Sequence, residues 1–170
     1  NIFGAPNTTV GGTGSNQGNV ISGNTTNGVV ITSGSGGTLL QGNTIGLNRA
    51  GTARLANGTV GLYSSSPNVT IGGTSAAARN IISGNTYEQI QIGSGGNGTV
   101  IQGNYIGPTA AGASGVANGG YGVYLNAANS ITVGGTAAGA GNLIMGNGGS
   151  GVVVAGNASG NGILGNSIYG

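Results

Sequence analysis

The 170-residue sequence has no cysteine, histidine, lysine, aspartate or tryptophan, and only four of its side chains are charged. The charged residues are Arg49, Arg54, Arg79 and Glu88. Without cysteine, the chain can form neither a disulfide framework nor a thiolate metal site. Because it has no basic stripe interleaved with aromatic residues, we expect no nucleic-acid partner. No run of about 18 apolar residues occurs, so we also predict no membrane-spanning helix.

The shortage of ionisable groups argues against most catalytic chemistry. A glycosidase of the usual kind needs two carboxylic acids beside the scissile bond, and Glu88 is the only one here. A calcium site needs several oxygen ligands including carboxylates, and a Ser-His-Asp triad would lack two of its members. We therefore expect a protein that is not an enzyme, with no catalytic residues, cofactor or metal ion. Glu88 could contact Arg54 on a neighbouring coil, as an exposed pair worth less than about 1 kcal/mol.

What the sequence does contain is a repeat. Glycine accounts for 42 residues, but without the strict G-X-Y period of collagen. Three short phrases recur in one order, at steps of about 61 residues. Valine or isoleucine followed by Gly-Gly-Thr begins at Val10, Ile71 and Val133; N-x-I-x-G-N begins at Asn19, Asn80 and Asn142; and G-N-x-I begins at Gly42, Gly103 and Gly165. We therefore divide a single domain, 1–170, into three repeats at about 1–58, 59–119 and 120–170.

Short β-branched runs, typical of strands, are separated by Gly, Asn, Ser and Thr. In the central repeat we expect strands at 60–63, 68–71, 80–83, 88–92, 100–102 and 104–106. Six strands per repeat indicate two coils of three strands. The chain is thus predicted to be an all-β, single-stranded parallel β-helix of about six coils. No segment has a helical apolar pattern, and the alanines at 76–78 are too few for a helix.

Four of the Asn-Gly pairs leave an alternative fold open, because Asn-Gly is also the commonest signal for a tight hairpin. These pairs stand at 27–28, 57–58, 97–98 and 118–119. They would suit an antiparallel array of hairpins. Such an array, however, would not need two unlike strand triplets to alternate.

The phrases N-x-I-S-G-N, I-G-G-T and Q-G-N-Y-I-G resemble repeats of large secreted or surface-attached prokaryotic proteins with a right-handed parallel β-helix, the pectate-lyase-like fold. The resemblance covers nearly the whole chain. It implies the right-handed turn of the coils and an extracellular or cell-surface location. It implies no activity, because many unrelated functions use this scaffold. The sugar-cleaving members rely on clustered aspartates or acidic calcium ligands, and this sequence has neither.

Each coil is expected to bury every second residue of its strands, so that stacked coils share one aliphatic column. The residues predicted to point inward include Ile21, Ile31, Ile71, Ile82, Ile92, Ile106 and Ile144. Asparagines at one corner of successive coils are expected to stack into an amide ladder that satisfies backbone groups in the turn.

The ends of such a solenoid are the first candidate contact surface. Both ends leave unpaired strand edges, and this chain has neither a helix to cap them nor a charge nearby. Because the chain holds whole pairs of coils, Ile168 and Tyr169 of one copy could continue into Ile2 and Phe3 of the next. We therefore predict a structural protein that assembles with itself, head to tail, into filaments or a surface layer. Six coils at about 4.8 Å give an axial repeat of roughly 29 Å.

The second candidate surface is the outward face of the first strand in each coil. Simple alternation along these strands places six residues outward: Phe3, Val30, Tyr63, Gln91, Tyr124 and Val153. Most of them are apolar or aromatic, and a column of such residues is a contact patch. We expect this face to pack against another solenoid. The alternative is a glycan- or surface-binding stalk or adhesin segment, in which the tyrosines stack on sugar rings.

Six asparagines begin the N-x-S/T triplet of N-glycosylation. They are Asn7, Asn24, Asn57, Asn68, Asn97 and Asn157. In a chain this rich in Asn, Ser and Thr, several such triplets would arise by chance. Solenoids that bind ice carry regular T-x-T arrays, and no such array occurs here.

Overall fold

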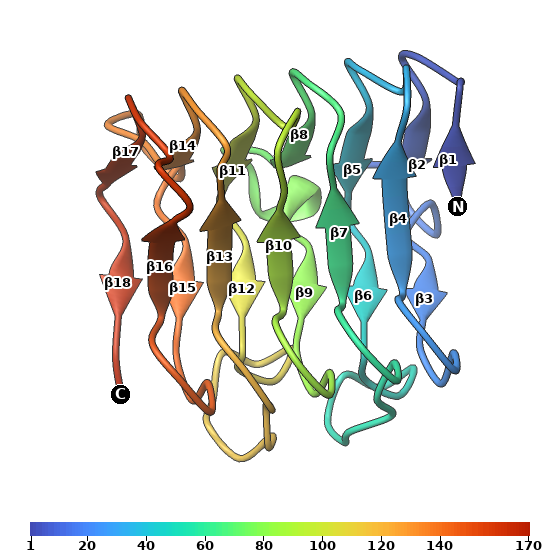
Figure 1. The fold of residues 1–170 in the computed structure, drawn as a ribbon. Helices are drawn as coiled ribbons and strands as arrows, with labels where there is room; N and C mark the ends of the chain where they lie inside the picture. The colour runs from blue at the N-terminus through green and yellow to red at the C-terminus, as the bar shows by residue number, and fades with distance from the viewer.

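Eighteen short strands wind around a single axis in the computed structural model, which describes all residues 1–170 (Figure 1). Strands of successive coils stack into three six-stranded sheets, here named A, B and C. Sheet A contains β1 (Ile2–Phe3), β4 (Val29–Thr32), β7 (Leu62–Ser64), β10 (Ile90–Ile92), β13 (Val123–Asn126) and β16 (Val152–Ala155). Sheet B contains β2 (Thr9–Gly11), β5 (Leu39–Gln41), β8 (Thr70–Gly72), β11 (Val100–Gln102), β14 (Thr132–Gly134) and β17 (Gly162–Leu164). Sheet C contains β3 (Val20–Ile21), β6 (Thr44–Ile45), β9 (Ile81–Ile82), β12 (Tyr105–Ile106), β15 (Leu143–Ile144) and β18 (Ser167–Ile168).

The chain visits sheets A, B and C in turn, and each strand pairs in parallel with its counterpart in the next coil. It circles the axis five times between β1 and β16, and β17 and β18 complete the sixth coil. In Figure 1 sheet A rises at the front while the coils advance from the N-terminus to the C-terminus, which makes the turn right-handed and places the termini at opposite ends. The predicted parallel β-helix is therefore confirmed. The hairpin alternative is wrong, since the strands pair in parallel. The one isolated antiparallel bridge, Leu47–Arg54, lies in a loop.

The strands predicted for the central repeat coincide with β7 to β12, with each boundary within two residues. They are strands because short β-branched runs alternate between a buried and a solvent-facing side, as in Ile90–Ile92, where only Gln91 is half-exposed. Glycine and asparagine between the runs supply the sharp corners.

One continuous aliphatic column fills the interior of the coils. It comprises 18 buried residues contributed by all three sheets and the adjoining turns. Of the seven isoleucines predicted to point inward, six are fully buried. The seventh, Ile21, is half-buried, because it lies in the first coil and only one neighbouring coil covers it.

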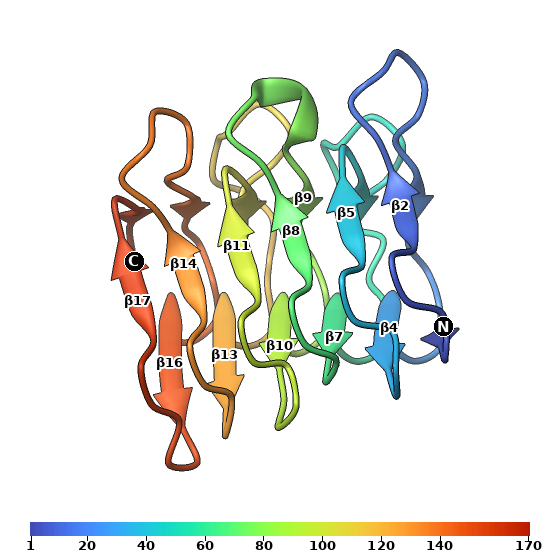
Figure 2. The ribbon, with the colours of Figure 1, turned by 90° about the horizontal axis from the view of Figure 1, so that it is seen from above.

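Two kinds of loop project from the solenoid. The loops between sheets B and C in the first, third and fifth coils carry the Gly-Gly-Thr phrase and rise above β2, β8 and β14 in Figure 2. The longer loops, 46–61 and 107–122, leave sheet C of the second and fourth coils, and the amide of Ala110 donates to the carbonyl of Gly51 between them (2.9 Å). The alanines at 76–78 form a single 3-10 turn, although no helix was predicted there. None of the helical structure is long and apolar enough to cross a membrane.

Candidate functional site

Both end coils expose residues that the inner coils bury or cover. Each edge strand has a paired neighbour on one side only. At the N-terminal end Phe3 is 74% exposed and Val20 is 47% exposed. At the C-terminal end Leu164, Ile168 and Tyr169 are likewise exposed, Tyr169 by 58%. The four residues predicted for end-to-end contact, Ile2, Phe3, Ile168 and Tyr169, therefore lie on the two open ends.

A ladder of asparagines runs the length of the solenoid at the corner between sheets B and C. We name it the corner ladder; it consists of Asn19, Asn43, Asn80, Asn104, Asn142 and Asn166. In every rung Nδ2 and the backbone N–H of one asparagine donate to Oδ1 of the asparagine in the next coil, at 2.8–3.1 Å. The four inner members are buried. The amide ladder expected from the sequence is thus present, and it satisfies backbone groups that would otherwise be buried without partners.

A second asparagine row, at the corner between sheets C and A, is interrupted. Asn24 donates to Oδ1 of Asn57, and Asn57 donates to Oδ1 of Asn85, both at 2.8 Å. Asn85 then donates to Oε1 of Gln89 (2.9 Å) and not to the next asparagine, Asn118. Further along, Oδ1 of Asn147 is buried without a partner. The row therefore breaks at the coil that contains Gln89.

Gln89 was not among the residues predicted from the sequence, although the sequence holds a signal for it. In the neighbouring coils the residue directly before the sheet A strand is Gly28, Gly61, Gly122 or Gly151, and Gln89 stands at the same place before β10. A side chain at this position projects into the corner, because a Cβ on Gly61 would lie 2.6 Å from Nδ2 of Asn85. Gln89 fills this space and supplies its own amide as a rung.

The outward residues of sheet A form a column whose register the strand pairing defines. Val30 lies beside Tyr63, Tyr63 beside Gln91, Gln91 beside Tyr124, and Tyr124 beside Val153. We name these five residues the lateral column. All five are half-buried.

Phe3 does not belong to the lateral column, which corrects the alignment expected from the sequence. It pairs with Thr32, two residues beyond Val30, and the position in line with Val30 is Asn1. A shift of two residues keeps a side chain on the same face, so alternation alone could not detect it. Phe3 remains on the N-terminal end, where it is the most exposed large apolar side chain.

Tyrosines gather around the lateral column. The rings of Tyr121 and Tyr124 lie 5.7 Å apart and are tilted by 54°. Tyr87 is 55% exposed, and its carbonyl accepts from the amide of Gly120, beside Tyr121. With Tyr63, these residues provide aromatic surfaces in three successive coils, the kind of surface that packs on an apolar partner or a sugar ring.

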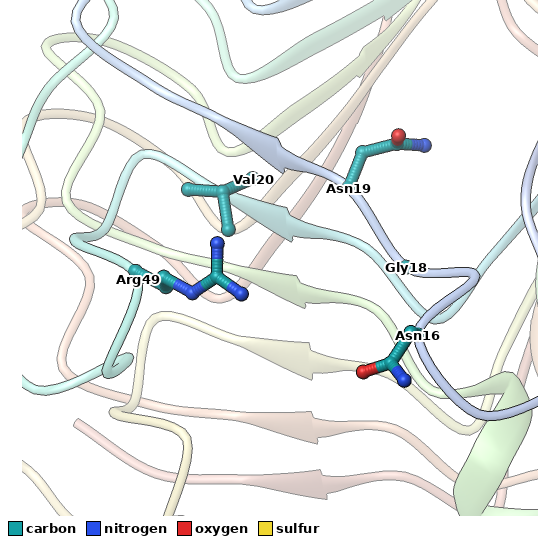
Figure 3. Close-up of a pocket in the computed structure, with 5 residues that line it drawn as sticks. All are labelled: Asn16, Gly18, Asn19, Val20 and Arg49. Carbon is teal, nitrogen blue, oxygen red and sulfur yellow. The ribbon is translucent and has the colours of Figure 1, made fainter.

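The hollow lined by Asn16, Gly18, Asn19, Val20 and Arg49 has a volume of about 480 Å³. It lies beside the free edge of β3 in the first coil. Figure 3 shows Arg49 extending from its loop toward Val20, with Asn16 and Asn19 across from it. All five residues are exposed, so the hollow is a feature of the open end and not an enclosed cavity. Arg49 brings a positive charge to this end, which corrects the prediction that no charge lies near the ends.

No family model matches the sequence, and neither the curated proteins nor the solved structures include a significant match. The right-handed parallel β-helix therefore stands on the structure alone, and a prokaryotic secreted origin stays a prediction from the sequence.

Two of the four charged side chains, those of Arg54 and Arg79, bind backbone or aromatic groups. Nε of Arg54 donates to the carbonyl of Gly84 (2.7 Å), so Arg54 does not form the pair with Glu88 considered from the sequence. The guanidinium of Arg79 lies 4.0 Å from the centre of the Tyr105 ring, and its Nε donates to Gly103. Such a cation–π contact is worth about 0.5–2 kcal/mol. These arginines hold neighbouring coils and loops together.

The structure separates the six glycosylation candidates. Asn57 is fully buried in the second asparagine row, so its amide is not accessible in the folded chain. Nδ2 of Asn24 donates into the same row. The other four, Asn7, Asn68, Asn97 and Asn157, are exposed and stay predictions.

Proposed function

We propose that this chain is a non-enzymatic structural protein, an extracellular β-solenoid subunit that assembles head to tail into filaments or a surface layer. The observation that carries the proposal is the pair of open ends, each of which presents three unpaired strand edges around the exposed end of an apolar core. Unpaired strand edges of this kind can pair with the edges of a second chain. The extracellular location rests on the sequence resemblance.

The two open ends are also compatible in coil type. In the inner part of the chain, coils that carry a Gly-Gly-Thr loop alternate with coils that are followed by a long loop. By this alternation, a coil that carries a Gly-Gly-Thr loop would follow the sixth coil. The first coil of a second copy is of this type. Continuing the observed pairings, β1, β2 and β3 of that copy would extend sheets A, B and C beyond β16, β17 and β18. A contact between unlike ends does not close on itself, so it generates an open filament.

Sedimentation velocity on the purified 170-residue chain, over a wide range of concentrations, tests the proposal. We expect the sedimentation coefficient to rise with concentration as end-to-end contacts form. A stable monomer at the highest concentration would contradict it.

A second function, glycan binding, is favoured by the lateral column. Tyr63 and Tyr124 lie two coils apart, about 9.6 Å, with the amide of Gln91 between them. Two flat aromatic rings with a hydrogen-bonding group between them suit an extended sugar chain. A carbohydrate-array screen of the same material distinguishes the two functions, since only this second one predicts specific sugar binding.

A further inference from the structure

We propose that the corner ladder sets the direction and the register of the end-to-end contact, with Asn166 of one copy donating to Oδ1 of Asn19 in a second copy. This inference rests on the head-to-tail assembly proposed above and specifies its partner as another copy of this chain.

The corner ladder has a direction. In all five rungs the donors belong to the earlier coil and the acceptor to the later coil. No rung runs the opposite way. The two ends of the ladder are therefore chemically different.

At the C-terminal end the ladder finishes on donors. Oδ1 of Asn166 accepts from the backbone N–H and Nδ2 of Asn142, at 3.0 and 2.8 Å. Nδ2 of Asn166 donates to the carbonyl of Val133 (2.8 Å). This leaves the backbone N–H of Asn166 and the second hydrogen of its Nδ2 without partners in the chain. In every inner coil these two donors bind the next Oδ1 of the ladder.

At the N-terminal end the ladder finishes on an acceptor. The backbone N–H and Nδ2 of Asn19 donate to Oδ1 of Asn43, at 3.1 and 2.9 Å. Oδ1 of Asn19 accepts nothing within the chain, and the residue is exposed. Donors at one end and an acceptor at the other fit a head-to-tail contact. Two like ends would instead place donors against donors or the acceptor against an acceptor.

The same asparagines also fix the register. The inner Nδ2 groups donate backward as well, to a carbonyl of sheet B in the preceding coil: Asn104 to Ile71 (2.9 Å) and Asn142 to Ile101 (2.8 Å). The same geometry at the junction directs Nδ2 of Asn19 to the carbonyl of Ile163 in the preceding copy. A slip of two residues would keep every apolar side chain facing the core but would break these bonds. A buried asparagine can specify register in this way where apolar contacts cannot.

The test variant is Asn19→Ala. It removes the free acceptor, while Oδ1 of Asn43 keeps its bond from the backbone N–H of residue 19. The stability of the monomer should therefore change little. Because the variant leaves the donors of Asn166 unpaired in the contact, we expect the concentration at which filaments form to rise about tenfold or more. Asn1→Ala is the matched control: Asn1 is exposed at the same end but lies outside the ladder, and its threshold should match that of the unmodified chain.

The partner residue completes a double-mutant cycle. Asn166→Ala alone should raise the threshold, and adding Asn19→Ala to it should raise the threshold little further, because one shared contact has already been lost. Circular dichroism checks that the Asn166 variant folds, since it removes an acceptor of Asn142. If it does not fold, the comparison of Asn19→Ala with Asn1→Ala decides.

The outcomes separate this inference from the proposed function. An unmodified chain that stays monomeric would overturn both. If the unmodified chain forms filaments, and Asn19→Ala forms them at the same concentration, the role of the ladder is overturned while head-to-tail assembly stands.

Discussion

Neighbouring residues of one strand have opposite surroundings, and Ile81 and Ile82 of β9 provide a sharp comparison. Ile82 is fully buried in the aliphatic column, whereas Ile81 faces outward and is half-buried. Aspartate at position 82 would place an unpaired carboxylate in an apolar interior. We expect Ile82→Asp to lower the free energy of unfolding by about 4 kcal/mol or more, and Ile81→Asp to cost far less. Urea denaturation of both variants measures the difference, and equal losses would refute the assigned orientation of β9.

Single residues were predictable from the sequence where one physical rule decides them. Alternation places Ile82 and five of its equivalents in the core, because a strand side chain has only two faces to choose between. Gln89 was not predictable in this way. Gln89 interrupts the second asparagine row by accepting from Asn85 at the corner between sheets C and A. Strand alternation does not predict which side chains meet at a corner.

Among the elements, the recurring Gly-Gly-Thr turns explain why one phrase persists through the chain. Gly72 ends β8 with a φ of +89°, and a Cβ there would lie 2.0 Å from the carbonyl oxygen of Gln102 in the next coil. The left-handed backbone and the close approach of a carbonyl together require glycine. Gly11 and Gly134, the equivalent residues of the other repeats, meet the carbonyls of Gln41 and Leu164 in the same way.

Gly72→Ala should therefore lower the stability of the fold much more than an alanine that only strains the backbone. Gly115 is the control, because it also has a positive φ (+120°) but no atom lies within 4 Å of an added Cβ. We expect Gly115→Ala to cost about 1–2 kcal/mol and Gly72→Ala clearly more. Thermal unfolding of the two variants tests this. Similar melting temperatures would contradict the close approach of Gly72 to the carbonyl of Gln102 in the next coil.

The strands could be predicted closely, but their exact register could not. Their positions follow from β-branched runs that the repeat presents three times, so each strand is supported by two equivalents. The register of β1 depends on how much chain the intervening loops take up. A two-residue shift leaves the faces unchanged, which is why Phe3 was aligned with Val30 and in fact pairs with Thr32.

At the scale of the whole molecule, the lateral column is predicted to join one filament to another. Replacing Tyr63 and Tyr124 together by serine removes its two aromatic rings while leaving the ends untouched. We expect single filaments to form as before but no longer to pair or bundle, with no loss of sugar affinity. Electron microscopy shows the bundling, and a carbohydrate array measures the affinity. If bundling persists and binding to a polysaccharide is lost, glycan binding replaces lateral packing as the role of this face.

In the proposed filament each open end continues the coils of another copy, so the number of coils in one chain sets the axial repeat of the assembly. With six coils per chain and a strand spacing of about 4.8 Å that runs unbroken through the junction, the filament should repeat every 29 Å or so. Cryo-electron microscopy of the purified 170-residue chain at high concentration measures this repeat. We expect filaments with that repeat and with the sheets continuous across the junction. Particles that remain single solenoids, or filaments whose subunits meet side by side, would contradict this expectation.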